Sequence, residues 1–466
     1  ISWLQRYDYG RRASGFYICP NHLAGLLEVV GVMGLSIVCW SRWPVWGKLL
    51  VGYAVGVCYV GQILTGSRGG YLSAVASLAV FGLLSFLILR RTGGRQAWAL
   101  LGAGGLAVVI LGAAAAFYVS RSDFLKDRAQ TTFDTRNMRV ELWKSALQQW
   151  KLQPIIGTGS ATYLYYGRLL RSPEVQLDPV YTHNDYLQLL AEYGLVAVAG
   201  LLAFLFAHAR AGLRNFSRLG PRRVAASHLL PSNALALNVG SLSAVGSYLV
   251  HSIFDFNLHI PANVLLLAFV FGILANDGVM RERAAVSAKA IVRGWWFALP
   301  ILGIALLVEC ARLLPGEYFS ESARAAVRDY QPGLALRYAN AGLKYDRTNP
   351  ELFHWLGAAN LQFADASPTE EAANSFREAG IRALENARSL FPQEQSYALR
   401  VAGACDDLHQ FDRAESVFAD LHRLDPKSTS LQKYYEGHRK MWEKALAPGV
   451  DPARPDAGTG AANGKL

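Results

Sequence analysis

Eight apolar stretches, each close to twenty residues long, constrain the fold of this chain more than any other feature. A bilayer core of about 30 Å is crossed by roughly 20 apolar helical residues. Because lipid cannot hydrogen-bond free backbone amides, such stretches cross it as α-helices. The sequence therefore predicts an all-α polytopic helical membrane bundle with spans at about 23–40, 44–64, 70–89, 97–119, 186–208, 234–253, 259–279 and 294–313.

Composition excludes several classes of protein. Only 17% of the 466 residues are charged, against about a quarter in an average soluble domain. The net charge of +11 would suit a nucleic-acid-binding protein, but the apolar residues stand in long blocks and do not alternate with the basic ones. Five scattered cysteines without a Cys-x-x-Cys pair favour neither a zinc site nor a disulfide framework. We expect membrane lipids as partners, and no nucleic acid.

Basic residues predict how the spans are oriented, because they are enriched in cytoplasmic loops. They gather in the links 41–48, 90–96, 209–233 and 280–293. Alternation of eight helices places all four links on the cytoplasmic side of the membrane. The opposite, non-cytoplasmic side then receives residues 1–22, the turn 65–69, the long loop 120–185, the turn 254–258 and everything after residue 314.

The least apolar span has a distinct predicted place. The stretch from Ala234 to Phe254 carries Asn238, Ser241 and Gly246 among other small or polar residues. Such residues let helix backbones approach one another closely. We expect this helix to be buried among the others.

Three domains are predicted: a membrane domain 1–316 with the large loop 120–185 on its non-cytoplasmic side, helical repeats over 317–447, and a disordered tail 448–466. Turn-forming steps before Pro350, Pro392 and Pro426 lie 42 and 34 residues apart. The second separation matches the period of tetratricopeptide repeats, which the tail resembles. The chain begins with Ile1 and shows no signal peptide, so we expect a further segment upstream.

Arginines at the predicted non-cytoplasmic face are candidate anion-binding residues. Arg68 lies in a Thr-Gly-Ser-Arg-Gly-Gly sequence at the mouth of a helix. Glycines allow close approach, the helix N-terminus favours anions, and a guanidinium binds phosphate bidentately. Arg136 and Arg139 begin a predicted amphipathic helix in the long loop. The alternatives are an arginine reaching the lipid headgroups at Arg68 and a solvated helix face at Arg136 and Arg139.

A candidate general base lies where the long loop meets the next span. His183 is followed by Asn184 and Asp185, with Glu192 about two turns further. A neutral imidazole can take a proton from a hydroxyl near neutral pH, and Asp185 is a candidate partner to orient it. We also expect Asn184 or Asp185 to cap the helix that follows.

A second group of polar residues surrounds a tight turn between two spans. His251, Asp255 and His259 precede Pro261, and His22 opens the first span. Continuous helix would give them metal-ligand spacing, but Pro261 argues against it, so we predict no metal. We expect these residues to line a pocket or to form a structural polar cluster.

These blocks together resemble the bacterial O-antigen ligase and O-antigen polymerase superfamily over roughly residues 10–280. The blocks are Gly15-Phe16, Pro20-Asn21-His22-Leu23-Ala24, Thr65-Gly66-Ser67-Arg68-Gly69-Gly70, Arg139-x3-Trp143, Pro154-Ile155-Ile156-Gly157-Thr158-Gly159, His183-Asn184 and the turn from His251 to Pro261. Ligases of this family show His-Asn, nine residues and Gly, as at Gly194, but Ala197 departs from their final Gly, Thr or Tyr.

The resemblance implies a GT-C-like membrane glycosyltransferase without a cofactor or metal. Its donor would be a saccharide on undecaprenyl pyrophosphate, and its acceptor a glycan, lipid or protein hydroxyl at the periplasmic face. By analogy His183 would be the base, and Arg68 with Arg136 or Arg139 would hold the pyrophosphate leaving group. The repeats would bind the acceptor, the polymer or a protein partner.

The sequence leaves several functions open. Ligase and polymerase share these motifs, and so does an oligosaccharyltransferase that modifies protein hydroxyls. A transporter or a non-catalytic membrane scaffold displaying repeats is the alternative from another class. Transporters tend to show internal symmetry between their halves, and no duplicated half is visible here.

Overall fold

The computed structural model describes residues 12–92, 121, 138–219, 232–276 and 286–446. Within these residues every regular element is helical, as the sequence predicts. The chain divides into two compact units, residues 1–282 and 283–466. The predicted span 97–119 and the predicted tail 448–466 lie outside the described residues.

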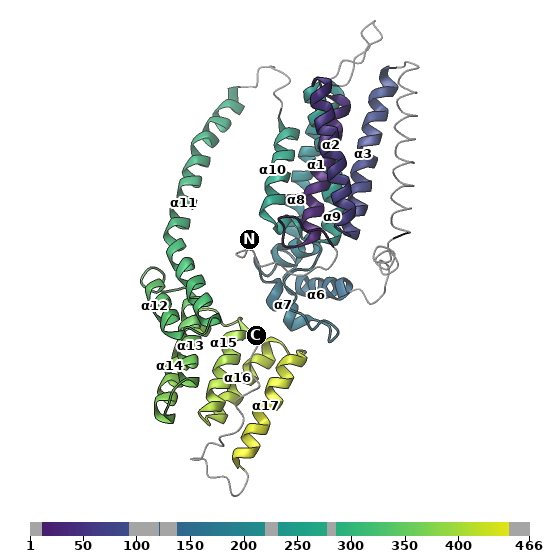
Figure 1. The fold of residues 1–466 in the computed structure, drawn as a ribbon. Coiled ribbons are helices and arrows are strands. Elements are labelled where there is room, and N and C mark those ends of the chain that lie inside the picture. The colour runs from purple at the N-terminus through teal and green to yellow at the C-terminus, as the bar shows by residue number, and fades with distance from the viewer. Residues whose placement is uncertain (1–11, 93–120, 122–137, 220–231, 277–285, 447–466) are drawn as a thin grey trace. The chain divides into compact units, whose positions relative to one another are not determined.

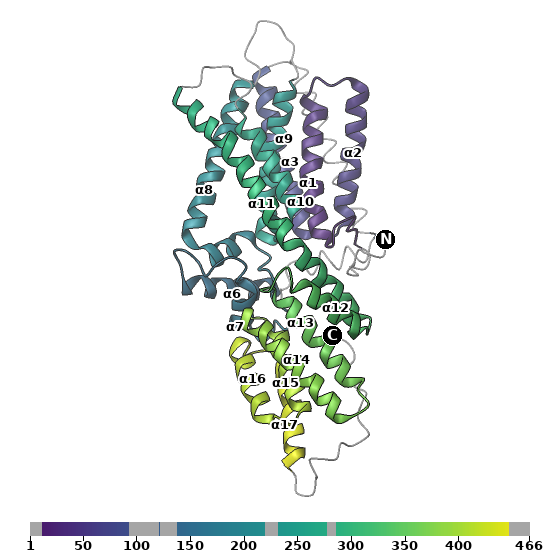
Figure 2. The ribbon, with the colours of Figure 1, turned by 90° about the vertical axis from the view of Figure 1, so that its left-hand side faces the viewer.

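The first unit is a bundle of long apolar helices with two shorter helices near one end (Figure 1, Figure 2). Its elements are α1 (Pro20–Trp40), α2 (Val45–Leu64), α3 (Arg68–Thr92), α6 (Met138–Leu152), α7 (Tyr163–Leu170), α8 (Asp185–Leu219), α9 (Asn233–Phe254), the 3₁₀ turn η2 (Asn257–His259) and α10 (Pro261–Ala275). Five of them, α1, α2, α3, α8 and α9, are long and apolar enough to cross a membrane. The chain is therefore a multi-pass membrane protein.

Helix α10 corrects the predicted span 259–279. It has only 15 residues, which reach about 22 Å at 1.5 Å per residue. Pro261 occupies its first turn, where a missing N–H costs nothing. The 3₁₀ turn η2 takes up the residues before it, and the helix ends at Ala275 because Asn276 is extended.

Helix α9 is the buried centre of the bundle, which confirms the expectation from its small and polar residues. In its most apolar window 61% of residues are buried, against 17% in α2. A Cβ added to Gly240 would come within 3.1 Å of the Met33 backbone. The Ser36 hydroxyl of α1 donates to the Ala236 carbonyl of α9 at 2.7 Å. Small residues thus bring α1 and α9 into backbone contact.

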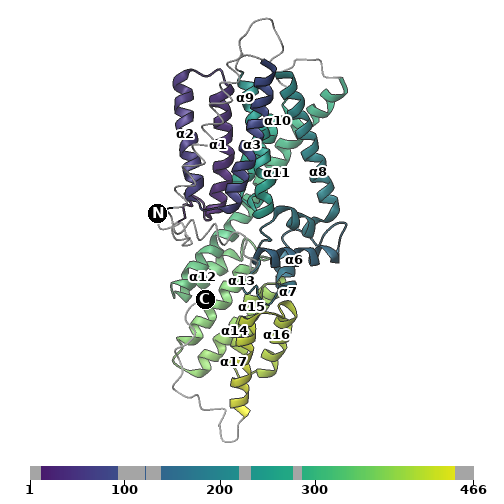
Figure 3. The same cartoon turned by 90° about the vertical axis from the view of Figure 1, so that its right-hand side faces the viewer.

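One end of the bundle holds links that carry basic residues. Figure 3 shows the link between α1 and α2 at the same end as the end of α3. The Ser232 backbone N–H donates to the Trp40 carbonyl at 2.8 Å, so the start of α9 lies beside this link. The starts of α3 and α8 lie at the opposite end, as the predicted alternation requires. The side of the membrane that each end faces stays a prediction.

The second unit begins with one long helix and continues as helix pairs. Its elements are α11 (Val286–Arg328), α12 (Pro332–Gly342), α13 (Pro350–Asp365), α14 (Glu370–Leu390), α15 (Gln395–Asp407), α16 (Phe411–Leu424) and α17 (Thr429–Leu446). Helix α11 contains the predicted span 294–313 and runs on past the predicted boundary at 316. None of its most apolar window is buried, which suits a surface exposed to lipid.

Consecutive helices of the second unit pack against each other, α13 with α14 and α15 with α16. The three predicted turns are confirmed, because Pro350 opens α13 while Pro392 and Pro426 lie just before α15 and α17. Buried Leu384, Val401 and Phe418 belong to one continuous core of this unit. The resemblance to tetratricopeptide repeats stays a prediction.

Acidification is expected to destabilise the second unit through His354. This side chain of α13 is 5% exposed, and its Nδ1 has no hydrogen-bond partner among the residues that the structure describes. Burial, assisted by the positive charge of Arg400, lowers the pKa of His354 from 6.5 to about 3. As the pH falls below about 6.5, His354 therefore becomes protonated in the unfolded chain but stays neutral in the folded chain. We expect a loss of about 2 kcal/mol at pH 5 relative to pH 7.

Thermal unfolding of the full chain in detergent, followed by circular dichroism at pH 7 and pH 5, measures this loss. We expect His354→Phe to reduce the difference between the two melting temperatures. The same change at the exposed His422 is the control. An equal pH effect in both variants would assign the acid sensitivity to other groups.

Candidate functional site

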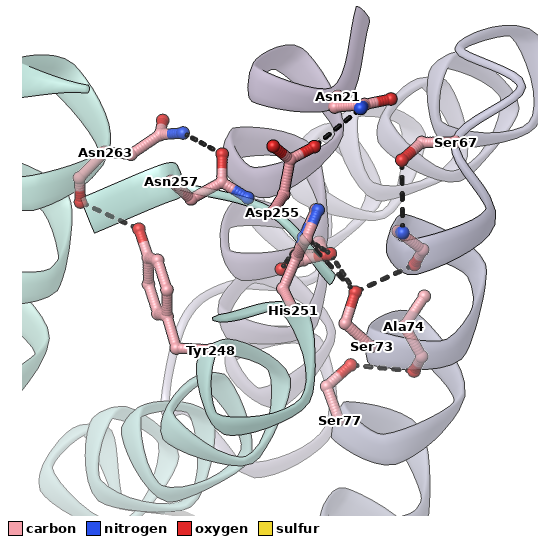
Figure 4. A network of polar contacts seen from close by, with 12 residues as sticks. Asn21, Ser67, Ser73, Ala74, Ser77, Tyr248, His251, Asp255, Asn257 and Asn263 are labelled. Carbon is pink, nitrogen blue, oxygen red and sulfur yellow. Dashed lines mark hydrogen bonds and ion pairs between the residues drawn. The ribbon is translucent and has the colours of Figure 1, made fainter. Parts of the chain in front are cut away.

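Three turns that are distant in sequence meet at one end of the first unit. They are the start of α1, the turn before α8 and the turn between α9 and α10. Asp255, on the third turn, receives a hydrogen bond from Asn21 of the first at 2.5 Å, as Figure 4 shows. It also lies within 3.1 Å of His183 on the second turn. One carboxylate therefore joins all three turns.

His183 is a partly exposed imidazole anchored by a buried acid. Its Nδ1 lies 3.1 Å from Oδ1 of Asp255. The His183 side chain is 35% exposed, whereas that of Asp255 is 3% exposed. His183 has φ +52, a left-handed conformation that costs a non-glycine residue about 1–2 kcal/mol. Such local strain often accompanies a functional residue.

Asp255 is held in its ionised form. Burial alone would raise its pKa, but the hydrogen bond and charge of His183, the charge of Arg139 and that of His251 hold the pKa well below its ordinary value. The carboxylate also accepts the Phe256 backbone N–H at 2.9 Å. In the neutral state of His183 the ionised carboxylate still accepts its Nδ1–H, and Nε2 is then left with a lone pair. That nitrogen can accept a proton.

The partner of His183 differs from the one that the sequence suggested. Asp185 lies 3.1 Å from Nδ1 of His259, and it accepts the Leu258 backbone N–H at 3.3 Å. Asp185 therefore bonds to the turn between α9 and α10. The role beside His183 that was predicted for Asp185 belongs to Asp255. Sequence proximity suggested Asp185, but as the first residue of α8 it faces the other turn.

Asn184 caps α8, as expected. Its side-chain oxygen accepts the Leu187 backbone N–H at 3.0 Å. The Thr182 hydroxyl donates to the Asn184 carbonyl at 2.7 Å and closes the turn that carries His183. The cap and the turn together fix the position of His183 relative to the helix.

A second carboxylate–imidazole pair lies deeper in the bundle. Glu28 and His251 are both fully buried, with His251 Nδ1 3.0 Å from one carboxylate oxygen of Glu28. The Ser73 hydroxyl donates to the other oxygen. Figure 4 shows Ser73 and His251 facing each other between α3 and α9. A paired buried charge at membrane depth is costly and is a functional candidate by default.

His22 lies beside this group at the start of α1. Its ring meets Phe256 edge to face, with ring centroids 4.9 Å apart. Its Nε2 is buried and has no hydrogen-bond partner within the described part of the chain. The His22 carbonyl accepts from the side-chain amide of Asn263 at 3.1 Å, which ties the start of α1 to α10.

The turn that carries Arg68 lies at the same end of the unit as His183. Arg12 donates to the Thr65 carbonyl at 2.8 Å and to Asn21 at 2.6 Å. Asn21 in turn donates to Asp255, the partner of His183. A chain of hydrogen bonds thus connects the turn 65–69 to the imidazole.

Arg68 itself opens α3, and its neighbour Gly69 packs against the buried histidine. A Cβ added to Gly69 would lie 3.1 Å from Cβ of Phe254 and 3.6 Å from Nε2 of His251. The Ser67 hydroxyl accepts the Gly70 backbone N–H at 3.2 Å and caps the helix (Figure 4). Gly69 is therefore required for the close packing of α3 against α9, whether or not it also helps to bind a ligand.

Of the two arginines predicted on the long loop, one reaches the site. Arg139, near the start of α6, lies 4.0 Å from Oδ2 of Asp255. Arg136 lies outside the described residues. Arg139 places a positive charge next to the His183–Asp255 pair. An anionic group of a substrate would be attracted to this position.

Helix α8 is broken where the sequence suggested a continuous span. Gly194 has φ +66, so the helix stops and restarts there. The segment 154–159 lies against the break. Its backbone N–H groups at Thr158 and Gly159 donate to the Ala191 and Glu192 carbonyls. The exposed backbone of the break is thereby satisfied, as a membrane requires.

Glu192 serves this break and does not reach His183. Its carboxylate accepts the Tyr163 backbone N–H at the start of α7 at 3.1 Å. It also accepts from Gln188 at 3.4 Å, and Gln188 accepts the Thr182 backbone N–H. Glu192 thus acts as a helix cap that supports the His183 turn through Gln188.

His251, Asp255 and His259 do not converge on one point. Each pairs with a different residue, namely Glu28, His183 and Asp185. Helix α9 ends at Phe254, so the three residues are not on one helical face. No group of three potential metal ligands occurs in the part of the chain that the structure describes.

Three of the connecting residues, Arg12, Ser73 and Phe256, were not singled out by sequence reasoning. Arg12 stands outside the spans, and Ser73 is one of several serines in α3. Phe256 is an aromatic residue among many. Only the packing of the helices shows that these side chains share one site.

Comparison with known families agrees with part of the sequence interpretation. Residues 53–202 match the family model described as O-antigen ligase. The match runs from α2 past the break in α8 and includes Arg68, Arg139 and His183. Searches of curated proteins and of solved structures found no significant match. The matched part of the chain is thus similar to the O-antigen ligase family.

Proposed function

We propose that this protein transfers a saccharide from an undecaprenyl-pyrophosphate carrier to a hydroxyl acceptor at the periplasmic face of a bacterial inner membrane. The family match supports a glycosyltransferase of the ligase or polymerase type. The observation that carries the proposal is the pair of His183 and Asp255, at the same end of the bundle as Arg68. This end carries a partly exposed imidazole, the candidate base, and the positive charge of Arg139.

In the proposed reaction His183 Nε2 takes the proton of the acceptor hydroxyl. The acceptor oxygen forms a bond to the anomeric carbon, and the bond from that carbon to the carrier phosphate oxygen breaks. The diphosphate leaves with the electron pair, and the anomeric configuration inverts. Asp255 holds the imidazole with its Nδ1–H inward and stabilises the imidazolium that forms.

The leaving diphosphate gains charge as the bond breaks. Arg68 at the start of α3 and Arg139 at the start of α6 are the proposed partners of this charge, with Arg136 as a further candidate. Preorganised guanidinium groups stabilise such charge without solvent reorganisation.

A deletion of the gene in its native bacterium tests the proposal. We expect a changed surface-glycan ladder on a gel. Loss of the polymer ladder with single repeats retained would indicate a polymerase, and carrier-linked chains left unattached would indicate a ligase. An unchanged glycan profile would refute a role in glycan transfer.

We expect transfer activity to survive EDTA, because the arginines supply the positive charge that a divalent ion would otherwise provide. The measurement compares product formation by the purified protein before and after chelation. Activity that is lost with EDTA and restored by a divalent ion would contradict the proposed role of the arginines.

A further inference from the structure

The last turns of α8, at the end of the bundle away from His183, carry a hollow that the proposed mechanism does not use. It is an open cavity of about 550 Å³ on the first unit. Its lining residues come from α8 and combine apolar with basic side chains. They are Phe206, Ala209, Arg210, Leu213, Arg214 and Ser217. Their spacing of three and four residues places them on a single face of the helix, which we call the α8 hollow.

This face of α8 points away from the helices of the bundle. The opposite face packs inward, because a Cβ added to Gly212 would lie 2.7 Å from the Leu274 side chain of α10. On the side of the α8 hollow, Phe206 is 67% exposed and Leu213 is 53% exposed. The described residues of the first unit therefore leave the apolar part of the hollow open to a ligand.

The α8 hollow is lined by positive charge. Arg210 and Arg214 lie one turn apart on the same face, and both side chains are exposed. No ion pair to Arg210 occurs in the part of the chain that the structure describes. The sequence contains no Asp or Glu between Glu192 and Asp255. The neighbouring turns of α8 therefore contribute no negative charge, and an anion is attracted to this place.

The position of the two arginines along α8 matches the depth of lipid headgroups. The helix begins at Asp185, and Arg210 follows 25 residues later. At 1.5 Å per residue this is roughly 37 Å of helix, whereas the hydrocarbon core of a bilayer is about 30 Å thick. The arginines thus lie beyond the hydrocarbon, and Phe206 lies one turn closer to it. A ligand that fits this order carries an anionic group next to an apolar chain.

We propose that the α8 hollow binds an anionic phospholipid, with its phosphate at Arg210 and Arg214 and an acyl chain along Phe206. A guanidinium binds phosphate oxygens bidentately, and basic pockets at the ends of membrane helices suit anionic headgroups. A soluble anion would leave the exposed Phe206 and Leu213 side chains uncovered. The inference concerns the end of the bundle away from His183 and does not depend on the proposed transfer reaction.

Native mass spectrometry of the full chain in detergent, titrated with phosphatidylglycerol, measures this binding. The same titration with phosphatidylcholine of equal chain length is the reference. We expect phosphatidylglycerol to bind at least tenfold more tightly. The double variant Arg210→Gln/Arg214→Gln should weaken its binding about tenfold, the effect of about 1.4 kcal/mol. Phe206→Ala should weaken it about threefold, because the acyl chain loses an apolar contact.

The control removes the same charge outside the hollow. Arg42→Gln/Arg218→Gln changes two exposed arginines at the same end of the bundle, and Arg218 lies one turn beyond Arg214 (Figure 3). We expect this variant to bind phosphatidylglycerol as the unmodified protein does. An equal loss in both double variants would show that overall charge attracts the lipid, and it would overturn the inference.

Two further outcomes would also contradict a lipid site. One is equal affinity for phosphatidylglycerol and phosphatidylcholine. The other is displacement of the bound lipid by an equal concentration of glycerol 3-phosphate, which would assign the α8 hollow to a soluble phosphate. If the double variant elutes as aggregate, the single change Arg210→Gln replaces it, with a loss of at least threefold as the expected result.

Discussion

His183→Ala is expected to abolish glycan transfer while the protein still folds and inserts. Loss of a positioned general base costs typically 10²–10⁴-fold in rate. The side chain is partly exposed and lies in a turn, so its removal leaves little cavity. Asp255 keeps its hydrogen bonds from Asn21 and from the Phe256 backbone. Complementation of the deletion strain, with surface-glycan ladders as readout, measures the effect.

His183→Asn is the sharper variant. Asparagine tolerates the left-handed conformation at φ +52 and can still donate to Asp255. It cannot act as a base near neutral pH. We expect inactive protein at normal abundance and with normal elution from a sizing column. An unchanged ladder would remove His183 from the mechanism, whereas lost protein would point to a structural role.

Gly194→Ala is expected to prevent stable folding of the first unit. A Cβ at this position would lie 2.4 Å from the Ile155 carbonyl oxygen and 2.6 Å from the Gly157 backbone nitrogen. The backbone conformation at φ +66 adds about 1–2 kcal/mol for any L side chain. Neither contact can be relieved by a rotamer change, because both neighbours are backbone atoms. We expect a loss of several kcal/mol, close to the total stability of many domains.

Two further variants serve as comparisons for this prediction: Gly157→Ala, which should be equally harmful, and Gly200→Ala, which should be harmless. Gly157 faces the same break, and its added Cβ would lie 2.3 Å from the Glu192 backbone, so we expect a similar loss. Gly200 lies on α8 six residues beyond Gly194 and has open space around an added Cβ. We expect it to tolerate alanine. Thermal unfolding in detergent compares the three, and equal melting temperatures would show that the break relaxes at little cost.

Local sequence patterns were sufficient for the helical class and for most of the spans. Apolar length and lipid's inability to bond amides leave no alternative to helices. The Asn184 cap and the turns before Pro350, Pro392 and Pro426 depend on neighbouring residues alone, so they too were predictable. The short length of α10 was not predicted, because hydropathy carries no information on where Pro261 starts the helix.

The pairing of the site residues could not be predicted in the same way. Sequence reasoning placed Asp185 beside His183, two positions away, but the carboxylate that bonds His183 comes from 72 residues further along. The break at Gly194 was predicted as continuous span because apolar content averaged over about twenty residues does not reveal the backbone conformation of one glycine. Its cause is the backbone of 154–159, which is distant in sequence and supplies the missing hydrogen bonds.

The amino-acid sequence by itself determined that this chain crosses a membrane as helices and that histidines, arginines and acids gather at one end of them. Only the tertiary structure decided which acid serves which histidine. The physical reason is the distance along the chain over which these effects act. Apolar patterning and helix capping depend on residues within a few turns of one segment. The His183–Asp255 and His259–Asp185 bonds exist only after two turns from separate helices have been brought together.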